Sequence, residues 1–433
     1  MTLKTSHLSN MKVLVLSRLY PSERRPIQGL FVQEQVSELI RQGVDITVVA
    51  PIPFSCRFLA MFREKWRIYY ETPKVEEIEG VWVYHPRILI WRGFYALSGF
   101  FYFFGVRKLV QALHQKKGFE LIHVQCIGLV PDGFGAALVN KAYNKPLVFT
   151  INGHNQLYRS QWHPVYKLLT KYAFDRASLI ITVSRKIQRL VCRCGANTRK
   201  TVIVGNGVSQ DTATERQALR PIKRDSRKIL LSVAYLLRSK GIDLVLRVLP
   251  DILRKEQSIS YYVIGSGPEE KYLKRLVSKL ALNDCVVFLG QLPHSEVVDH
   301  MAACDVFVLP SWNESFGLVY VEAMAQGKPV IGCKGQGIED VIEHEVTGLL
   351  VEPKDLVSLK NAIILLLKNE DLRKRIGENA YQVVLRDYTW RNAMAKVRGH
   401  YQMLSENRNV SFLCQSQGID RGLGNSCEVT GFQ

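Results

Sequence analysis

The sequence predicts two α/β domains, each built on a doubly wound parallel sheet, that face each other across a cleft. Short apolar runs bounded by glycine, proline and polar residues recur along the chain, and helix formers follow most of them; this alternation is typical of parallel βαβ units. The length of 433 residues exceeds what one hydrophobic core usually holds. A polar, basic stretch near the middle separates the two alternating halves.

Composition narrows the classes of function. The net charge of +19 favours an anionic partner, which means nucleic acid, an anionic membrane surface or a phosphorylated substrate. The sequence shows no aromatic RNA-binding signature, zinc finger or recognition-helix module, so we expect no nucleic-acid partner. The nine cysteines lack paired spacing, and residues 1–12 contain no signal-peptide core. We therefore predict a cytoplasmic protein with free thiols.

The first half of the chain follows the alternating pattern. Its predicted strands are residues 12–17, 45–50, 120–125, 146–151, 177–184 and 201–204. The first two strands and a helix over 32–41 form one βαβ unit, and the loop after the first strand contains Gly29. Open α/β sheets bind ligands at such loops. We assign residues 1–209 to the first domain.

Residues 54–115 interrupt the alternation with interleaved basic and aromatic side chains. The basic residues are Arg57, Arg63, Lys65, Arg67, Arg92, Arg107 and Lys108, and the aromatic residues among them include Phe54, Phe58, Phe62, Trp66, Tyr69 and Trp91. This pattern fits adsorption to an anionic bilayer. The alternative is that the aromatic side chains are core and the cations face solvent, and the sequence favours neither. The most apolar run, residues 94–106, is shorter than the roughly 18 residues that a spanning helix needs.

The second half repeats the pattern after a boundary. Residues 210–227 are polar and basic around a proline, and we predict a linker there. The second domain is predicted at 228–388, with strands or strand-and-turn segments at 228–234, 261–268, 286–293 and 305–309. A final helix is predicted at 389–404. Residues 405–433 lose apolar periodicity, so we expect a disordered tail.

One strand-turn-helix segment of the second domain carries the predicted site. A buried strand at 305–309 leads through a turn into a helix at 317–326. The free backbone N–H groups of residues 315–318 and the positive end of the helix dipole suit an anionic ligand such as a diphosphate. Glu314 and Glu322 are eight residues apart, just over two helical turns, so both can face one ligand and bind sugar hydroxyls.

Three further motifs follow these residues in order. They are Gly-Lys-Pro-Val-Ile at 327–331, Gly-Gln-Gly at 335–337 and Thr-Gly-Leu-Leu-Val at 347–351. With the two glutamates they resemble the donor-site signature of retaining GT-B glycosyltransferases, a group that includes bacterial cell-surface polysaccharide transferases. The resemblance implies a GT-B fold of two Rossmann-like domains. The first domain would bind the acceptor, the second the nucleotide-sugar, and the helix at 389–404 would pack back on the first.

The resemblance also implies residue roles. We predict Lys240, Glu314 and His154 as catalytic residues, the lysine beside the departing diphosphate and His154 beside the transferred sugar. The predicted donor-binding residues are Gly29, Arg238, Gly290, Gln291, Leu292, Ser315, Phe316, Gly317, Leu318 and Glu322. A glycine that serves only the turn would also explain Gly29. Tyr235 stands where relatives have an arginine, which leaves Arg238 as the candidate for the second positive charge. Asn152 stands where relatives commonly have a histidine.

The predicted reaction is transfer of a sugar, with retention, from a nucleotide-diphosphate sugar to a glycan or lipid-linked acceptor in cell-surface polysaccharide biosynthesis. No carboxylate is clearly presented as a nucleophile, so we favour front-face departure of a diphosphate stabilised by Lys240 and the amides of 315–318. We expect no cofactor and no metal, because basic side chains would stabilise the diphosphate in place of a metal ion. The predicted partners are the donor, the acceptor and an anionic membrane surface, on whose inner face the protein would be peripheral. The alternatives are a sugar phosphorylase or epimerase of similar fold, and a membrane-associated nucleotide-sugar-binding protein without turnover.

Overall fold

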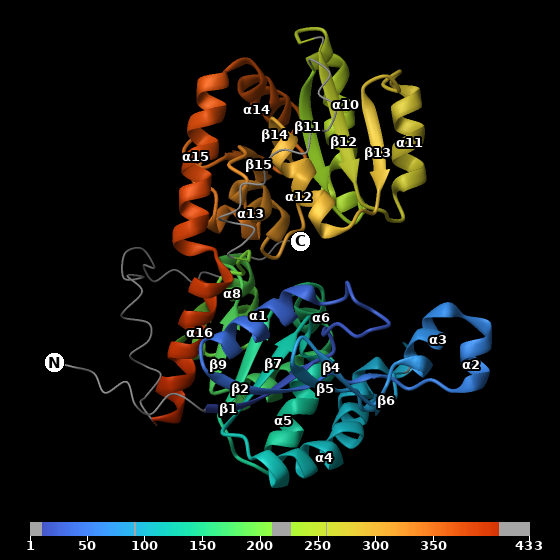
Figure 1. Ribbon diagram of the computed structural model, residues 1–433, viewed down its shortest axis with the longest axis vertical. Helices are drawn as coiled ribbons and strands as arrows, with labels where there is room; N and C mark the ends of the chain where they lie inside the picture. Colours follow the sequence, from blue (N-terminus) through green and yellow to red (C-terminus); the bar gives the residue numbers. More distant parts are fainter. Residues whose placement is uncertain (1–10, 91, 210–226, 257, 407–433) are drawn as a thin grey trace, which may run out of the picture.

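Two parallel sheets organise the chain, one in each half, and helices pack against both (Figure 1). The computed structural model describes residues 11–90, 92–209, 227–256 and 258–406. This architecture confirms the predicted fold class. The carboxyl ends of the two sheets face each other, because loops that follow strands of one sheet hydrogen-bond to a loop that follows a strand of the other.

The first sheet has eight strands, and all neighbours are parallel except β4 and β5. In spatial order they are β10 (Thr201–Ile203), β9 (Leu179–Thr182), β8 (Leu147–Ile151), β7 (Leu121–Cys126), β1 (Met11–Ser17), β2 (Val44–Val49), β5 (Val81–Tyr84) and β4 (Val75–Ile78). Every residue of β7 and β8 is buried, as expected of central parallel strands covered on both faces. Two further strands of the first half, β3 (Ile52–Pro53) and β6 (Arg87–Ile88), form a separate two-stranded sheet.

The second sheet has six strands, all parallel. In spatial order they are β13 (Val286–Gly290), β12 (Ile259–Ile264), β11 (Lys228–Val233), β14 (Val306–Val308), β15 (Val330–Cys333) and β16 (Leu349–Val351). Each sheet has a point at which the strand order reverses, between β1 and β7 in the first and between β11 and β14 in the second. Loops diverge at such a point and leave a crevice at the carboxyl ends.

Helices connect the strands and cover the sheets. Those of the first half are α1 (Leu30–Arg41), α2 (Arg57–Phe62), α3 (Glu64–Glu71), α4 (Ser98–Lys117), α5 (Phe134–Asn140), α6 (Asn155–Trp162), α7 (Pro164–Arg176) and α8 (Arg185–Arg193). Those of the second half are α10 (Ile242–Leu253), α11 (Glu270–Lys279), α12 (His294–Ala303), α13 (Leu318–Ala325), α14 (Leu356–Lys368), α15 (Glu370–Asp387) and α16 (Trp390–Ser405). The shorter helical segments are η1 (Arg92–Leu97), η2 (Leu129–Gly133), η3 (Thr198–Lys200), η4 (Arg238–Lys240) and η5 (Gly337–Asp340).

The last helix returns to the first sheet. α16 lies beside α1, and the indole N–H of Trp390 donates a hydrogen bond to the carboxylate of Glu34. Further along α16, the buried hydroxyl of Tyr401 is hydrogen-bonded to Nδ1 of His123 in β7. Burial lowers the pKa of His123 to about 3, so the ring is neutral. These contacts anchor α16, the last helix of the described residues, in the core of the first half.

The remaining differences from the sequence predictions are local. α13 begins at Leu318 rather than at Gly317, because Gly317 adopts the left-handed conformation that precedes the helix. α16 continues to Ser405, one residue into the predicted tail. Residues 210–226 of the predicted linker and 407–433 of that tail lie outside the described residues, and the domain limits stay predictions. The seven cysteines of the described residues are free.

Candidate active site

An ion pair lies at the order-reversal point of the second sheet. Lys240 follows β11, and Glu314 follows the neighbouring β14, so the fold brings the two loops together. Lys240 Nζ is 2.6 Å from Glu314 Oε2, and the side chains are 19% and 15% exposed. At this exposure the pair is partly shielded from water, and its charges act more strongly than surface charges do. The structure therefore joins two of the three predicted catalytic residues.

The loop that follows Glu314 presents backbone N–H groups to the same place. Within the described part of the chain, no acceptor is recorded for the N–H groups of residues 315–318. Gly317 has a φ of +98°, and a Cβ there would come within 2.7 Å of the Tyr320 ring. A side chain is thus excluded on both counts. The turn leaves four donors at the N-terminus of α13, where the helix dipole favours negative charge.

Two residues of the first half contact this loop directly. Nδ1 of His154, just beyond β8, lies 2.6 Å from the Ser315 hydroxyl, and the Ser184 hydroxyl donates to the carbonyl oxygen of Ser315 at 2.6 Å. His154 is only 6% exposed, and its Nε2 has no hydrogen-bond partner. Burial, together with the ammonium of Lys186, lowers the pKa of His154. The ring is neutral at neutral pH and keeps one buried nitrogen available to a ligand.

Sequence reasoning missed a second lysine at the site. Lys186, in the first turn of α8, donates from Nζ to Oε1 of Gln336 at 2.5 Å. The same oxygen accepts the backbone N–H of Glu314 at 3.1 Å. Burial lowers the pKa of Lys186, and the charge of Glu314 opposes that effect. A positive charge from the first half therefore lies beside the ion pair of the second half.

Glu322 also has a partner that was not foreseen. Its Oε1 is 3.1 Å from Nε2 of His294, in the first turn of α12, and Glu322 is 9% exposed. The hydrogen bond that His294 donates to Glu322 raises the pKa of His294. Burial raises the pKa of Glu34 on α1, and the charge of Glu322 adds to it. Both predicted acids therefore lie near residues of the first half.

Gly29 and residues 290–292, which were also predicted to bind the donor, lie at the ends of strands or in the loops that follow them. Gly29 caps α1 at a φ of +83°, and a Cβ there would collide with the Leu19 carbonyl oxygen at 2.2 Å, so the turn alone requires a glycine. Gly290 ends β13, and the exposed Gln291 and partly buried Leu292 continue that loop to His294.

The loop at residues 314–318, which we call the donor loop because it is predicted to bind the donor, contains two hydrophobic residues, Phe316 and Leu318. Phe316 is buried with its ring 6.1 Å from that of Tyr388. Leu318 packs against two hydrophobic core clusters, and the larger of them contains residues of both halves. The buried side chain of Phe316 is therefore structural, whereas that of Leu318 is only partly buried.

The arginine predicted to supply the second positive charge does not join the cluster. The side chain of Arg238 is exposed and has no hydrogen bond or ion pair within the residues described. Tyr235 is 61% exposed. No position-specific signal in the sequence distinguished Lys186 as a replacement, since it lies in the other half of the chain.

A chain of amides lines the carboxyl edge of the first sheet. Asn152 donates to Gln125 at 2.9 Å, Gln125 donates to Gln35 at 2.7 Å, and Gln35 reaches Asn206 at 3.4 Å. Oδ1 of Asn152 is buried without a partner. With Nε2 of His154, it makes two open polar atoms on the side of the first sheet that faces the donor loop.

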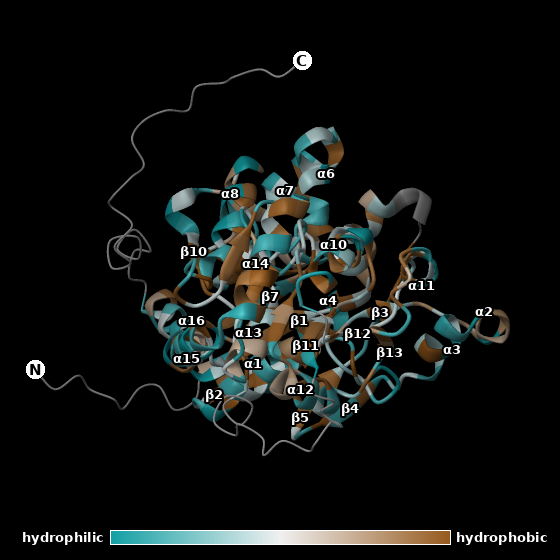
Figure 2. Cartoon of the chain, turned by 90° about the horizontal axis from the view of Figure 1, so that it is seen from above, coloured by the Kyte–Doolittle hydropathy of each residue, from teal (hydrophilic) through white to brown (hydrophobic). Residues whose placement is uncertain are grey.

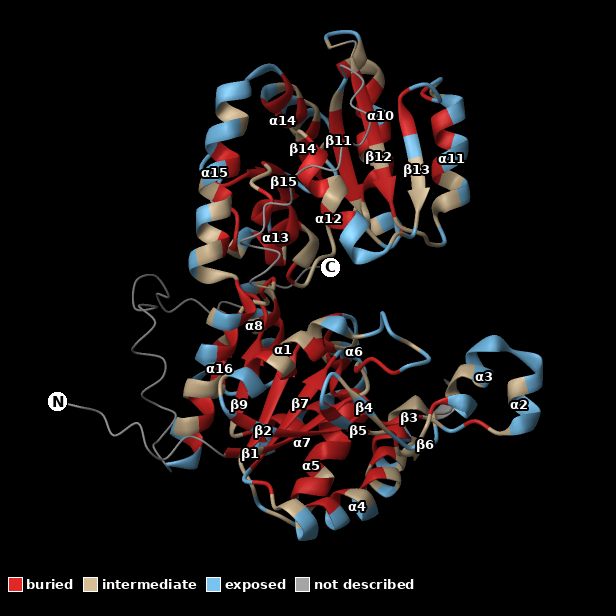
Figure 3. Cartoon of the chain, in the orientation of Figure 1, coloured by how far each residue is buried: buried red, intermediate tan, exposed pale blue. Residues whose placement is uncertain are grey.

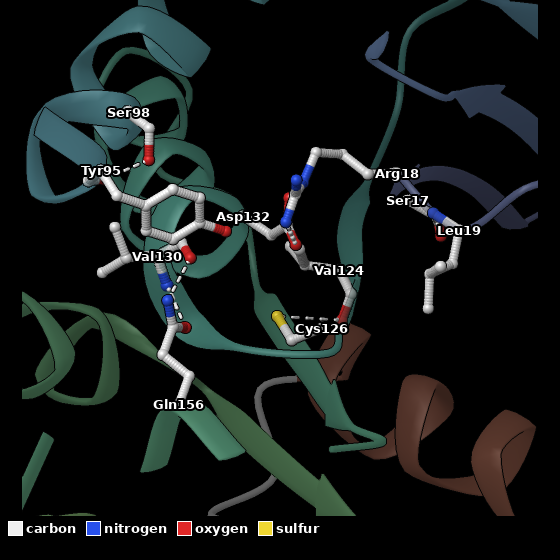
Figure 4. Close-up of polar contacts among 10 residues, drawn as sticks. All are labelled: Ser17, Arg18, Leu19, Tyr95, Ser98, Val124, Cys126, Val130, Asp132 and Gln156. Carbon is white, nitrogen blue, oxygen red and sulfur yellow. Dashed lines mark hydrogen bonds and ion pairs between the residues drawn. The ribbon is translucent and has the colours of Figure 1, made fainter. Parts of the chain in front are cut away.

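The order-reversal point of the first sheet holds a buried ion pair of its own. Figure 4 shows Arg18, which follows β1, turned toward Asp132, which follows β7 in η2. Two guanidinium nitrogens donate to the two carboxylate oxygens, and the Nη2 contact measures 3.0 Å. Asp132 is 2% exposed and Arg18 20%. The pair fixes the loop after β1 against η2, where Gln156 also bonds the backbone of Val130.

The arrangement can bind and stabilise an anion with two lysines and four amides, between two acids suited to hydroxyl groups. Across the described ranges, no three histidine, cysteine, aspartate or glutamate side chains gather as a candidate metal site.

Family models match both halves of the chain. Residues 28–212 match Glycosyltransferase Family 4 and residues 211–383 match Glycosyl transferases group 1. The chain is 26% identical over 388 residues to a Bacillus subtilis protein named as a teichuronic acid biosynthesis glycosyltransferase, TuaC, covering 86% of this chain and 94% of the relative. It is also 26% identical over 420 residues to an uncharacterized glycosyltransferase of Methanocaldococcus jannaschii, covering 92% and 99%.

Solved structures share the fold. Sucrose-phosphate synthase from Thermosynechococcus elongatus superposes with a TM-score of 0.71 at 21% identity, over 92% of this chain and 100% of that one. HepE from Anabaena, in complex with UDP, superposes with a TM-score of 0.67 at 20% identity, over 90% and 99%. At these identities the similarity establishes the GT-B fold alone.

Proposed function

Because the chain belongs to the group 1 glycosyltransferases of GT-B fold, we propose that it moves a sugar, with retention, from a nucleotide-diphosphate sugar to a glycan or lipid-linked acceptor. The observation that carries the proposal is that the N–H groups of residues 315–318 have no acceptor among the described residues and directly follow Glu314, the ion-pair partner of Lys240. Donors that are already in place stabilise the charge that develops on a leaving diphosphate without reorganising. The relative named for teichuronic acid biosynthesis supports a role in cell-surface polysaccharide synthesis.

The retaining course is proposed to proceed on one face of the sugar. A double displacement needs a free carboxylate as nucleophile, whereas Glu314 is held by Lys240 at 2.6 Å. Front-face departure needs only that the diphosphate leaves toward the amides and lysines and then accepts the proton of the incoming hydroxyl. His154 is proposed to contact the transferred sugar through its open Nε2, and Glu314 and Glu322 to bind sugar hydroxyls.

Lys186 is proposed to supply the second positive charge. The family arginine is replaced by Tyr235, and Arg238 lies exposed without a partner among the described residues. Lys186 is half-buried and within 2.5 Å of Gln336, next to the Glu314 backbone. Since Lys186 comes from the first half and Lys240 from the second, the full charge assembles only when the two halves are together.

The donor is proposed to lie mainly on the second half and the acceptor on the first. The complex of HepE with UDP makes a uridine nucleotide a reasonable first donor to test. The open Oδ1 of Asn152 and Nε2 of His154 provide hydrogen-bonding groups on the acceptor side. We propose that the protein works at the inner face of a membrane. None of the helices described has the length and apolar character needed to cross a bilayer.

One observation favours a second candidate, a protein that binds a nucleotide-sugar without turnover. Tyr235, in place of the arginine, removes a charge from the loop that also carries Lys240. Binding and turnover are separable by experiment. A nucleoside diphosphate would stabilise both candidates against heat, but only the transferase would release it from a donor sugar.

The test is a panel of UDP- and GDP-sugars, first by thermal shift and then by release of nucleoside diphosphate in the presence of a membrane extract. We expect at least one donor to raise the melting temperature and to be consumed by the wild-type protein. Lys240→Met and Glu314→Gln should each abolish most of that turnover. Turnover that survives both substitutions would reject the site, and binding without turnover would favour the second candidate.

A further inference from the structure

A helical hairpin projects from the first half of the chain. We define the hairpin as α2 (Arg57–Phe62) with α3 (Glu64–Glu71), which pack against each other. It extends away from the body of the molecule in Figure 1, and in the perpendicular view of Figure 2 it again stands at the outer edge. Neither helix has a buried residue, in contrast to the neighbouring helices of Figure 3.

The tip of the hairpin is apolar. Phe58, Met61 and Phe62 are 67%, 76% and 68% exposed, and Leu59 is 37% exposed. Apart from Arg57, every residue of α2 is apolar. Scattered exposed apolar residues are ordinary, but several large ones on one projecting helix mark an interaction surface.

The base of the hairpin is fixed, so the apolar tip is presented in a defined place. The hydroxyl of Ser55 donates to the carbonyl oxygen of Trp66 at 2.8 Å. The Trp66 and Tyr69 rings are edge-to-face at 5.9 Å, and the Arg25 guanidinium lies over the Tyr69 ring at 5.3 Å. The contacts of Ser55 and Arg25 hold α3 to the body, and no residue of α2 is buried.

Four exposed cations precede or follow the apolar residues of α2 in the sequence. Arg57, Arg63, Lys65 and Arg67 are exposed, and none has an ion pair within the described residues. Of the two acids in the hairpin, Glu71 is paired with Arg24 at 3.5 Å. Aromatic and aliphatic side chains beside lysine and arginine match the interface of an anionic bilayer, where rings enter the acyl boundary and cations meet phosphate head groups.

We infer that the hairpin docks the protein on an anionic membrane surface, with Phe58, Met61 and Phe62 inserted at the interface. The inference rests on the proposed function in one respect, since a lipid-linked acceptor gives the protein a reason to bind a membrane. It adds that the hairpin is the segment that binds. The occupant is a bilayer rather than a second copy of the chain. A convex hairpin whose tip is a six-residue helix offers far less than the roughly 800 Å² that each partner buries in a stable complex.

Residues 54–115 were predicted either to adsorb to a membrane or to form core helices with a solvated face, and the structure supports a different alternative in different parts of this range. Tyr102 of α4 is fully buried in the core, as the core alternative expects. The exposure of α2 fits adsorption instead. Phe100 and Phe104 of α4 remain 40% and 57% exposed, but α2 has no buried residue, so we assign the docking to α2 with the cations that flank it.

The experiment is co-sedimentation of the full chain with vesicles of phosphatidylcholine alone or with phosphatidylglycerol. The first variant carries Phe58→Ser, Met61→Ser and Phe62→Ser, and the second carries Arg63→Glu and Lys65→Glu. The matched control carries Leu356→Ser, Val357→Ser and Leu365→Ser, three exposed apolar positions on α14 that are 38%, 61% and 41% exposed.

We expect wild type and control to bind the anionic vesicles. Each hairpin variant should bind them with an affinity at least about tenfold lower. Because the substituted side chains are exposed, the melting temperature should not change. Release of nucleoside diphosphate from a soluble donor should also persist in both hairpin variants, so loss of docking is distinguishable from loss of the active site. Unchanged vesicle binding by the hairpin variants, equal binding to neutral vesicles, or a dimer that the triple variant abolishes would each overturn the inference.

Discussion

Replacement of Lys186 by methionine is the most informative perturbation of the proposed site. The substitution keeps the length of the side chain and removes a charge that lies, half-buried, 2.5 Å from Gln336 Oε1. A hydrogen bond to a charged group contributes about 1.5–3 kcal/mol. If Lys186 stabilises the diphosphate in the transition state, this loss corresponds to a decrease of roughly 10- to 150-fold in turnover.

The assay is steady-state release of nucleoside diphosphate from the donor that the thermal-shift panel identifies. We expect kcat to fall and KM to change little, because the charge on the diphosphate is largest in the transition state. Lys186→Arg should restore part of the loss, since it returns the charge. Lys374→Met is the matched control, because Lys374 is 73% exposed on α15, and it should leave kcat unchanged.

The combination with Lys240→Met separates a shared role from two independent ones. If both lysines act on one diphosphate, the double variant should lose less than the product of the single losses, because the two effects are coupled. A kcat for Lys186→Met within about twofold of wild type, beside a large loss for Lys240→Met, would refute the role assigned to Lys186. Equal losses in Lys186→Met and Lys186→Arg would show instead that the contact with Gln336 is only structural.

Three further predictions concern stability. Gly317→Ala places a Cβ on a residue with a φ of +98° and should lower the free energy of unfolding by about 1–2 kcal/mol, measured by urea denaturation. Tyr401→Phe leaves Nδ1 of the buried His123 without its partner and should cost about 1–3 kcal/mol in the same assay. Glu322 raises the pKa of His294, so the pair stabilises the fold below the ordinary histidine pKa, and that contribution is lost as pH rises through the raised value. His294→Gln should therefore be less stable than wild type near pH 6 and should approach it at higher pH, in thermal melts across a pH series.

Each of the three has a contradicting outcome. Wild-type stability of Gly317→Ala would mean that the turn relaxes without strain. An unchanged unfolding free energy for Tyr401→Phe would show that the hydrogen bond between Tyr401 and His123 does not stabilise the packing of α16 on the first sheet. A stability difference between His294→Gln and wild type that grows with pH would reverse the sign assigned to the pair.

The sequence predicted the two parallel sheets because a buried parallel strand is recognisable from a short local run of residues. Runs such as Leu121–Cys126 and Leu147–Ile151 are mainly apolar, and the structure buries every residue of each. The order of motifs around Glu314 indicated a GT-B glycosyltransferase, and glycosyltransferase family models match both halves of the chain. Lys240 and Glu314 were named separately, and their contact follows from the adjacency of β11 and β14, which a strand pattern does not specify.

Partners that come from distant parts of the chain could not be predicted in the same way. Lys186 is one cation among several in α8, and only the docking of the two halves puts it beside Gln336. His294 follows the predicted loop at Gly290 to Leu292 by two residues, yet its pairing with Glu322 depends on how α12 packs against α13. In each case the missing information is tertiary.

The hairpin shows a different limit. Phe58 and Phe62 beside Arg57 and Arg63 were recognised as a membrane-like pattern, but the same pattern describes a core helix with a solvated face. Whether an aromatic side chain is covered depends on what packs over it, and in the structure no residue of α2 is buried. Local propensity carries no information on that point.

The most direct test of the account is a structure of the protein with a nucleoside diphosphate bound. We predict phosphate oxygens within about 3 Å of the N–H groups of Gly317 and Leu318 and of the ammonium of Lys240, with Glu314 and Glu322 turned toward the bound ligand. A diphosphate bound away from the N-terminus of α13, or the two glutamates turned from the space between the two sheets, would contradict it.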